Sequence, residues 1–181
     1  VESDKENMEK LKETYSIKEV YTDFNDALAN PEIDTIYVAL PNDLHYVFAK
    51  KALEAKKHVI CEKPFTLSLE QLLNLEKIAA ENEVILVEAI TNQYLPNYAS
   101  IKEELKTIGD IKIVECNYSQ YSSRYDLFKE GTILPAFNPK KGGGALMDIN
   151  IYNIHFVVGL FGKPLSVRYA ANVEKGIDTS G

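Results

Sequence analysis

Hydrophobic positions follow two alternating patterns over the first half of the chain. Short runs of consecutive apolar residues are typical of parallel strands that are covered on both faces. These runs are 35–40, 58–61 and 84–87. Between them, apolar residues recur at helical spacing in 44–55, and a capping-box pattern at Ser68 opens a helix that extends to about Asn82. This alternation predicts an α/β fold with a doubly wound parallel sheet.

The pattern changes after about residue 90. The segments that follow are a helix over 96–107, a long alternating strand over 111–121, an aperiodic loop over 122–141, a helix over 145–160 and a second alternating strand over 165–173. A long loop of this kind often lines a functional site. We therefore expect two domains, at 1–90 and 91–181. A second capping box, Ser3 to Glu6, predicts that the chain enters a helix at its start.

Composition narrows the class of protein. The 181 residues are 45% hydrophobic and 26% charged, as in globular soluble domains. The net charge of -7 disfavours nucleic acid and anionic membranes as partners. No apolar run of spanning length and no signal peptide are evident. Cys61 and Cys116 lie far apart, which fits a reduced, cytoplasmic setting better than a disulfide framework.

Polar residues cluster after the predicted strands, where ligands bind in open parallel sheets. Asn42 and His45 follow the first strand and open the next helix, where they can face a bound nucleotide. The alternative is that Asn42 or Asp43 only caps this helix. After the second strand, Lys63 lies between Glu62 and a proline that restrains the backbone. Lys63 can serve in electrostatic or proton-transfer chemistry, or it can form a solvated ion pair with Glu62.

A carboxylate, a phenol and an imidazole fall on one face of the helix over 145–160. Asp148, Tyr152 and His155 are spaced i, i+4 and i+7. A nearby cationic lysine would lower the pKa of Tyr152 and let the phenol exchange protons with a substrate hydroxyl. The alternative is that Tyr152 is a core aromatic residue. We interpret His155 as a packed histidine.

Other candidate motifs carry less chemistry. The three glycines at 142–144 allow either an anion contact or a tight turn, and they lack the spacing of a P-loop. The cysteines and histidines do not have metal-ligand spacing, so no metal site is expected. The G-x-G-x-x-G fingerprint is absent.

Four motifs, read together, resemble the Gfo/Idh/MocA oxidoreductase family in order and spacing. They are Leu40-Pro41-Asn42-x-x-His45, Cys61-Glu62-Lys63-Pro64, Glu88-Ala89 and Gly142-Gly143-Gly144-Ala145-Leu146-Met147-Asp148-x-x-x-Tyr152. The resemblance implies NAD(P)-dependent hydride transfer on sugars, cyclitols or related alcohols. It implies a Rossmann domain followed by an α/β domain with a large open, mostly antiparallel sheet. It also implies a homo-oligomer that forms through this sheet.

The resemblance assigns roles to individual residues. Lys63 matches the lysine of the family's catalytic site, and Asp148 and Tyr152 match its acid and acid/base positions. Many members have histidine in place of Tyr152, and tyrosine there resembles the branch that includes dimeric dihydrodiol dehydrogenases and glucose-fructose oxidoreductase. The positions that bind the cofactor in the family are matched by Pro41, Asn42, His45, Glu62 and Lys63.

The sequence also departs from the family pattern. The first strand and its glycine fingerprint would precede Val1, and Gly176 to Gly181 resembles the lead into a further strand, so we expect a truncated, inactive piece. Asn150 replaces a common glycine, while Gln93 and Leu95 replace Arg and His. Asp4 stands where NADP-preferring relatives often carry arginine, which slightly favours NAD. The competing hypothesis is a non-catalytic nucleotide-binding or assembly protein on the same fold.

Overall fold

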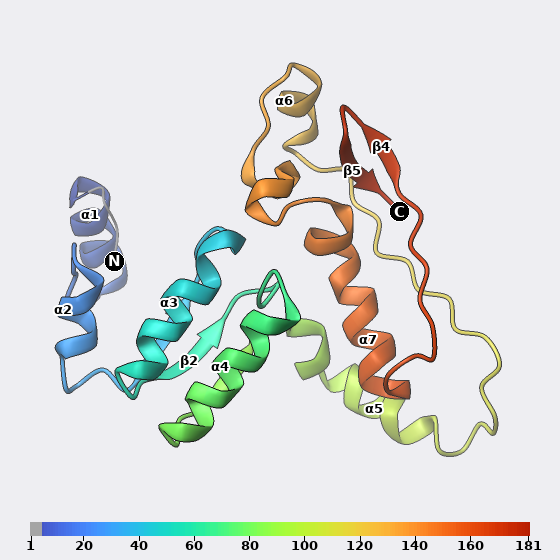
Figure 1. Ribbon diagram of the computed structural model, residues 1–181, viewed down its shortest axis with the longest axis horizontal. Helices are drawn as coiled ribbons and strands as arrows, with labels where there is room; N and C mark the ends of the chain where they lie inside the picture. Colours follow the sequence, from blue (N-terminus) through green and yellow to red (C-terminus); the bar gives the residue numbers. More distant parts are fainter. Residues whose placement is uncertain (1–4) are drawn as a thin grey trace.

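The computed structural model describes residues 5–181, and Figure 1 shows its elements in chain order. The capping box at Ser3 and the residue Asp4 lie outside this range. The chain begins with helices α1 (Lys5–Tyr15) and α2 (Phe24–Ala29). Asp23 begins α2, because its side chain accepts a hydrogen bond from the backbone N–H of Asn25 at 2.8 Å.

A three-stranded parallel sheet is the centre of the first half. It has the order β1-β2-β3, and its strands are Thr35–Val38, His58–Cys61 and Leu86–Glu88. Helix α3 (Asn42–Glu54) connects β1 to β2, and α4 (Leu69–Glu81) connects β2 to β3. The predicted α/β fold with a parallel sheet is confirmed. The helix start at Ser68 is also confirmed, because the Ser68 hydroxyl accepts from the backbone N–H of Gln71 at 3.2 Å, although the Gln71 side chain accepts from the backbone N–H of Leu67 and not from that of Ser68.

The strand register brings three carboxyl ends together. Val38 is opposite Cys61 in the β1–β2 pair, and Cys61 is opposite Glu88 in the β2–β3 pair. All three strands therefore end at one edge of the sheet. The residues that follow β1 and β2 consequently emerge next to each other.

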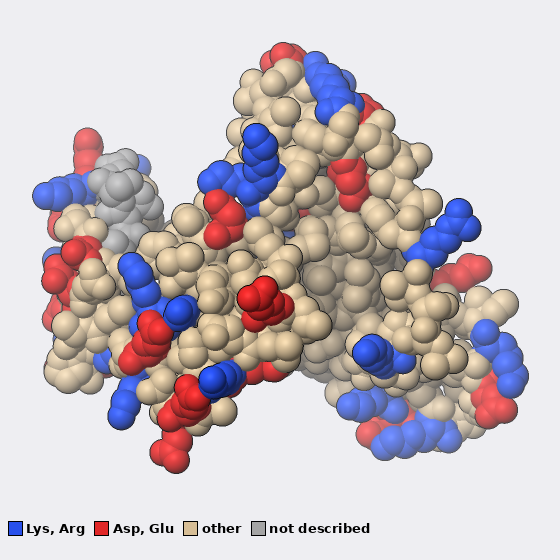
Figure 2. All heavy atoms as spheres, viewed as in Figure 1, with Lys and Arg blue, Asp and Glu red and all other residues tan. Residues whose placement is uncertain are grey.

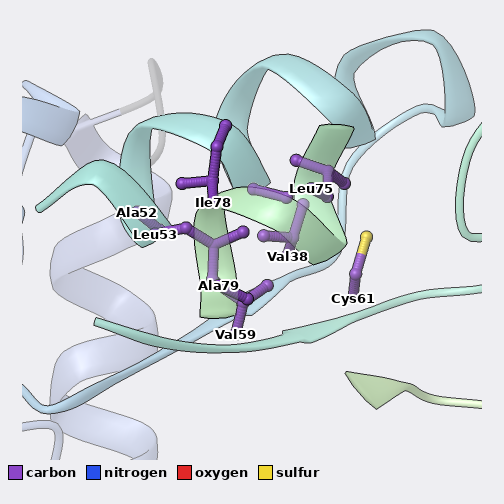
Figure 3. Close-up of a cluster of buried hydrophobic side chains, with 9 residues drawn as sticks. Val38, Ala52, Leu53, Val59, Cys61, Leu75, Ile78 and Ala79 are labelled. Carbon is purple, nitrogen blue, oxygen red and sulfur yellow. The ribbon is translucent and has the colours of Figure 1, made fainter. Parts of the chain in front are cut away.

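The main hydrophobic core lies between this sheet and helices α3 and α4 (Figure 3). Alternation along β1 and β2 turns Val38, Val59 and Cys61 toward these helices. The helices contribute Ala49, Ala52, Leu53, Leu75, Ile78 and Ala79. Because the helices supply several alanines, they can approach both the sheet and each other closely. This half therefore buries a core built only from its own residues.

The second half contains less regular structure than the sequence predicts. The segment from Gly109 to Tyr121 has no regular secondary structure, so the strand expected over 111–121 is wrong for the described chain. The strand expected over 165–173 is reduced to β4 (Asn172–Glu174), which pairs antiparallel with β5 (Ile177–Ser180). A strand is stable only when a neighbour accepts its hydrogen bonds. Figure 1 draws the long segment before α6 as coil, and this segment belongs to neither of the two sheets in the described chain.

The segment predicted as an aperiodic loop contains short helices. These are α6 (Tyr125–Lys129) and the 3₁₀ turns η2 (Pro135–Phe137) and η3 (Pro139–Lys141). Phe128, Phe137 and Ile177 form a second, small buried cluster, with Tyr125 packed against it. The sequence analysis missed this cluster because its members do not follow a helical or strand period.

The remaining helices of the second half follow β3 along the chain. After η1 (Thr91–Tyr94) comes α5 (Pro96–Glu104), and the predicted helix over 145–160 is present as a π-helical turn, η4 (Leu146–Asn150), followed by α7 (Ile151–Phe161). By length and composition alone, the segment Pro139–Phe161 could cross a membrane, which was not expected from the sequence. This is weak evidence, because a core helix of a soluble protein passes the same test.

Candidate active site

Lys63 connects the two halves of the chain. Its ammonium donates hydrogen bonds to the Asp148 carboxylate at 2.8 Å and to the Asp148 backbone carbonyl at 2.6 Å. The two side chains are only 16% and 30% exposed, so this ion pair is far less screened than a surface pair. The solvated Lys63–Glu62 pair does not form. Glu62 instead accepts from the Tyr37 hydroxyl at 2.6 Å, and this hydrogen bond raises the pKa of Tyr37 to about 12.

Tyr152 lies beside the same lysine. The Lys63 ammonium is 5.3 Å from the centroid of the Tyr152 ring, a cation–π distance, and the ring stacks on Tyr118 with centroids 5.0 Å apart. Within the described chain the Tyr152 hydroxyl has no hydrogen-bond partner. It is therefore free to bond with a bound substrate.

The pKa of Tyr152 differs from the expectation. Burial raises it above its ordinary value, and this effect outweighs the lowering by the Lys63 charge. Tyr118, Glu62 and Asp148 each raise it further. The prediction that the lysine would lower this pKa overall is therefore wrong, although the direction of the lysine's own contribution is right. Tyr152 is a neutral phenol at pH 7, ready to donate a proton.

A wide helical turn places Asp148 and Tyr152 together. Asp148 lies in η4 and Tyr152 in the first turn of α7. π-Helical turns often occur at functional sites, where they displace a side chain from the regular helical position. The start of this helix is held by Asp178, whose carboxylate accepts from the backbone N–H of Leu146 at 2.9 Å. The sequence analysis missed Asp178 because it is distant along the chain and belongs to no motif.

His45 lies between the loops that follow β1 and β2. It is fully buried, and its ring nitrogens lie 2.9 Å from the carbonyl oxygen of Pro64 and 2.8 Å from that of Leu40. Both nitrogens are thus occupied by backbone groups of the loops after β1 and β2. His45 therefore joins these loops, and its contact with a nucleotide stays a prediction.

Asn42 also has a partner in the second half. Its side-chain amide donates to the carbonyl oxygen of Gly142 at 3.0 Å. The alternative that Asn42 or Asp43 caps α3 is not supported, because the N-cap position is Pro41 and no side chain caps it. Gly142 has φ +73°, a left-handed backbone conformation that favours glycine. The glycine segment therefore makes a tight turn here.

A second set of hydrogen bonds fixes α7 against the end of the sheet. His155 Nε2 lies 2.9 Å from a Glu88 carboxylate oxygen. The amide of Asn92 donates to the carbonyl oxygen of Tyr152 at 2.7 Å, and that of Gln93 donates to the carbonyl oxygen of His155 at 2.7 Å. His155 is therefore a partner of Glu88, and Gln93 holds the backbone of α7 in place. These contacts fix the position of Tyr152 relative to the carboxyl edge of the sheet.

A cavity of about 220 Å³ lies where the two halves meet. Its lining residues are Pro41, Asn42, Arg124, Pro135, Ala136 and Asp148. The loop after β1 and the ion-paired Asp148 therefore line the same cavity. Acidic and basic side chains are scattered over the face shown in Figure 2, and they do not gather into a single charged patch. Over residues 5–181, no group of three or more potential ligands could hold a metal ion.

The parallel sheet, with loops that meet a polar cavity at its carboxyl edge, defines the class of α/β proteins that bind nucleotides at this edge. Comparison with known families agrees. Residues 1–90 match the model of the oxidoreductase family with an NAD-binding Rossmann fold, and residues 101–180 match the GFO/IDH/MocA C-terminal domain. The chain belongs to the GFO/IDH/MocA oxidoreductase family.

Individual relatives are similar over most of the chain. It is 39% identical over 164 residues to scyllo-inositol 2-dehydrogenase (NADP(+)) IolU of Bacillus subtilis, covering 89% of the chain and 49% of that protein. It is 31% identical over 180 residues to trans-1,2-dihydrobenzene-1,2-diol dehydrogenase of Xenopus laevis, covering 97% of the chain and 52% of that protein. The chain therefore spans about half the length of these relatives.

A solved structure has the same fold. Apo scyllo-inositol dehydrogenase from Lactobacillus casei superposes with a TM-score of 0.70 at 21% identity, covering 89% of this chain and 45% of that one. At this identity the likeness establishes the fold alone.

Proposed function

We propose that the protein is an NAD(P)-dependent dehydrogenase that transfers a hydride between the cofactor and a hydroxyl-bearing carbon of a sugar, a cyclitol or a related alcohol. The observation that carries this proposal is the convergence of Lys63, Asp148 and Tyr152 at the junction of the two halves. The activities after which the related scyllo-inositol and dihydrodiol dehydrogenases are named support the same substrate class.

The residues at the sheet edge fit a dinucleotide. Pro41 and Asn42 line the cavity at the carboxyl end of β1, and the Glu62–Lys63 loop ends β2 beside them. The buried Asn92 Oδ1 and Asp43 Oδ1 have no hydrogen-bond partner among the described residues, so this region retains unused acceptors. The bound cofactor supplies the hydride acceptor or donor. Pro41, Asn42, Glu62 and Lys63 would hold its nicotinamide end.

Tyr152 carries the proton-transfer role. In carbonyl reduction its neutral phenol donates a proton to the developing alkoxide oxygen, and in alcohol oxidation its phenolate accepts the hydroxyl proton. The Lys63 ammonium is placed to stabilise this phenolate, since its charge lowers the pKa of Tyr152. Lys63 is itself held by the Asp148 carboxylate, so Asp148 fixes the position of the charge.

The test is turnover by the complete protein with NAD and NADP on a panel of sugars and cyclitols. Tyr152→Phe and Lys63→Met are each expected to lower kcat by a factor on the order of 10² to 10⁴, the usual contribution of a positioned acid/base group. Absence of turnover over the whole panel, with cofactor binding intact, would instead favour a non-catalytic nucleotide-binding protein. The same turnover assays, run with NAD and with NADP, give the preference between the two cofactors.

The proposal extends to the cellular setting and to partners. A cytoplasmic location is supported by the two cysteines, which are both free. The net charge of -7 supports a protein without nucleic-acid or membrane partners. The proposal includes a homo-oligomer that forms through the sheet of the second domain, as the match to the family's C-terminal domain suggests. Sedimentation of the complete protein tests the assembly.

A further inference from the structure

Among the residues that the structure describes, the Arg124 side chain lines the active-site cavities without a partner. Arg124 lies just before α6, and within residues 5–181 its guanidinium forms no ion pair or hydrogen bond, although its backbone N–H donates to the Ser122 hydroxyl at 3.2 Å. The other cations at the junction are compensated, because Lys63 pairs with Asp148 and Lys141 pairs with Asp43 at 2.7 Å. Arg124 thus retains all five of its N–H donors for another group.

Arg124 lines two cavities that share the active-site carboxylate. One is the cavity of about 220 Å³ that also contacts Pro41 and Asn42. The other, of about 120 Å³, has Arg124, Ala136 and Asp148 in common with it. The second cavity adds polar side chains, namely Gln120, Ser122, Ser123 and Thr179. A ligand next to Asp148 would therefore meet Arg124 and several hydroxyl groups.

The position of Arg124 is held by the small aromatic cluster. Phe128, one turn further along α6, is fully buried and stacks on Phe137 with ring centroids 5.0 Å apart. The carbonyl oxygen of Arg124 accepts from the backbone N–H of Phe128 at 3.2 Å. Lys175 holds the other end of α6, since its ammonium donates to the carbonyl oxygen of Phe128 at 2.8 Å. The backbone of Arg124 is thus fixed relative to the cavities.

Resting on the function proposed above, we propose that Arg124 is the residue that selects the substrate, by donating two parallel hydrogen bonds to a pair of adjacent oxygens remote from the reacting carbon. The planar guanidinium fits two acceptors side by side, which a single ammonium does not. Adjacent oxygens of this kind occur as vicinal hydroxyls of a cyclitol or sugar, and as the carboxylate of a sugar acid. An alcohol with a single oxygen does not provide them.

The experiment compares the complete wild-type protein with Arg124→Gln and Arg124→Lys on inositol isomers, hexoses and the corresponding uronic acids. In Arg124→Gln, the KM for the accepted polyols is expected to rise roughly 10- to 100-fold, the usual effect of losing hydrogen bonds to a charged group, with kcat little changed. The affinity for NADPH is expected to stay unchanged. Arg124→Lys is expected to restore the uronic acids, which need a charge, better than the neutral polyols, which need the planar donor pair.

The matched control is Lys140→Gln, which removes one positive charge from an exposed lysine that lines neither cavity. It is expected to leave KM and kcat unchanged. An unchanged KM in Arg124→Gln for every polyol that the wild type oxidises would overturn the inference while leaving the proposed function intact.

A direct titration of the same polyols and uronic acids into the NADPH-bound proteins separates the two proposals. Binding that depends on Arg124 without any turnover would retain the inference and reject the dehydrogenase function. No binding to the wild type, or equal binding to wild type and Arg124→Gln, would reject the role of Arg124.

Discussion

The two halves of the chain differ in how they are stabilised. The first half has a cluster of nine buried residues between its parallel sheet and helices α3 and α4, whereas the buried cluster of the described second half is smaller and consists of Phe128, Phe137 and Ile177. The active-site residues come from both halves, since Lys63 follows β2 and Tyr152 lies on α7. The difference indicates that the first half is the scaffold, and that polar contacts to it position the chemistry carried by the second half.

The largest expected effect is a loss of activity that leaves the stability of the protein unchanged. Tyr152→Phe removes a hydroxyl that has no hydrogen-bond partner within the described chain, so the free energy of unfolding is expected to change by less than about 0.5 kcal/mol. Its kcat is expected to fall by a factor on the order of 10² to 10⁴. Tyr94→Phe, at an exposed position, is the control that should change neither quantity. Steady-state kinetics and denaturant unfolding of the same preparations check both.

The next effect concerns the scaffold core. Leu53 is fully buried between α3 and the sheet, so Leu53→Ala is expected to lower the free energy of unfolding by about 2 to 5 kcal/mol. Leu165 is fully exposed, and Leu165→Ala is expected to cost less than about 0.5 kcal/mol. Equal effects in chemical denaturation would contradict the location of the core.

Phe128→Ala tests the independence of the small cluster. Because only three buried residues make up this cluster, its loss is expected to open α6 and the β4–β5 pair locally, while the main transition shifts by less than in Leu53→Ala. Hydrogen exchange followed by mass spectrometry would show faster exchange at residues 125–137 and unchanged exchange in α3 and α4. Faster exchange in α3 or α4 would show that the two clusters unfold as one unit.

The smallest effect concerns the junction. Glu88→Gln weakens the contact to His155 at 2.9 Å, in which both side chains are largely shielded from solvent. The free energy of unfolding is expected to fall by about 1 kcal/mol, which is the net contribution of a typical hydrogen bond. Glu76→Gln, on α4 and away from the junction, is the control. The KM for the polyol is expected to rise more in Glu88→Gln than in the control, because α7 is then less firmly positioned.

The sequence predicted the parallel sheet and the Lys63, Asp148 and Tyr152 candidates, because strands, helices and motif spacing are local patterns. The confirmed elements, such as β2 and α4, are those in which the pattern of hydrophobic residues along the segment itself indicates a strand or a helix. The strand over 111–121 was wrong because pairing depends on a neighbour that local pattern does not specify. The raised pKa of Tyr152 was not predicted because burial is a tertiary property.

The most direct test of the account is the pH dependence of kcat/KM for alcohol oxidation in wild type and Tyr152→Phe. Because burial raises the pKa of Tyr152, the phenolate that accepts the proton is scarce at pH 7 and increases with pH. The account therefore predicts that the oxidation rate rises through the alkaline range in wild type, and that this rise is absent in Tyr152→Phe. The same alkaline rise in Tyr152→Phe would contradict the assignment of Tyr152 as the proton-transfer group.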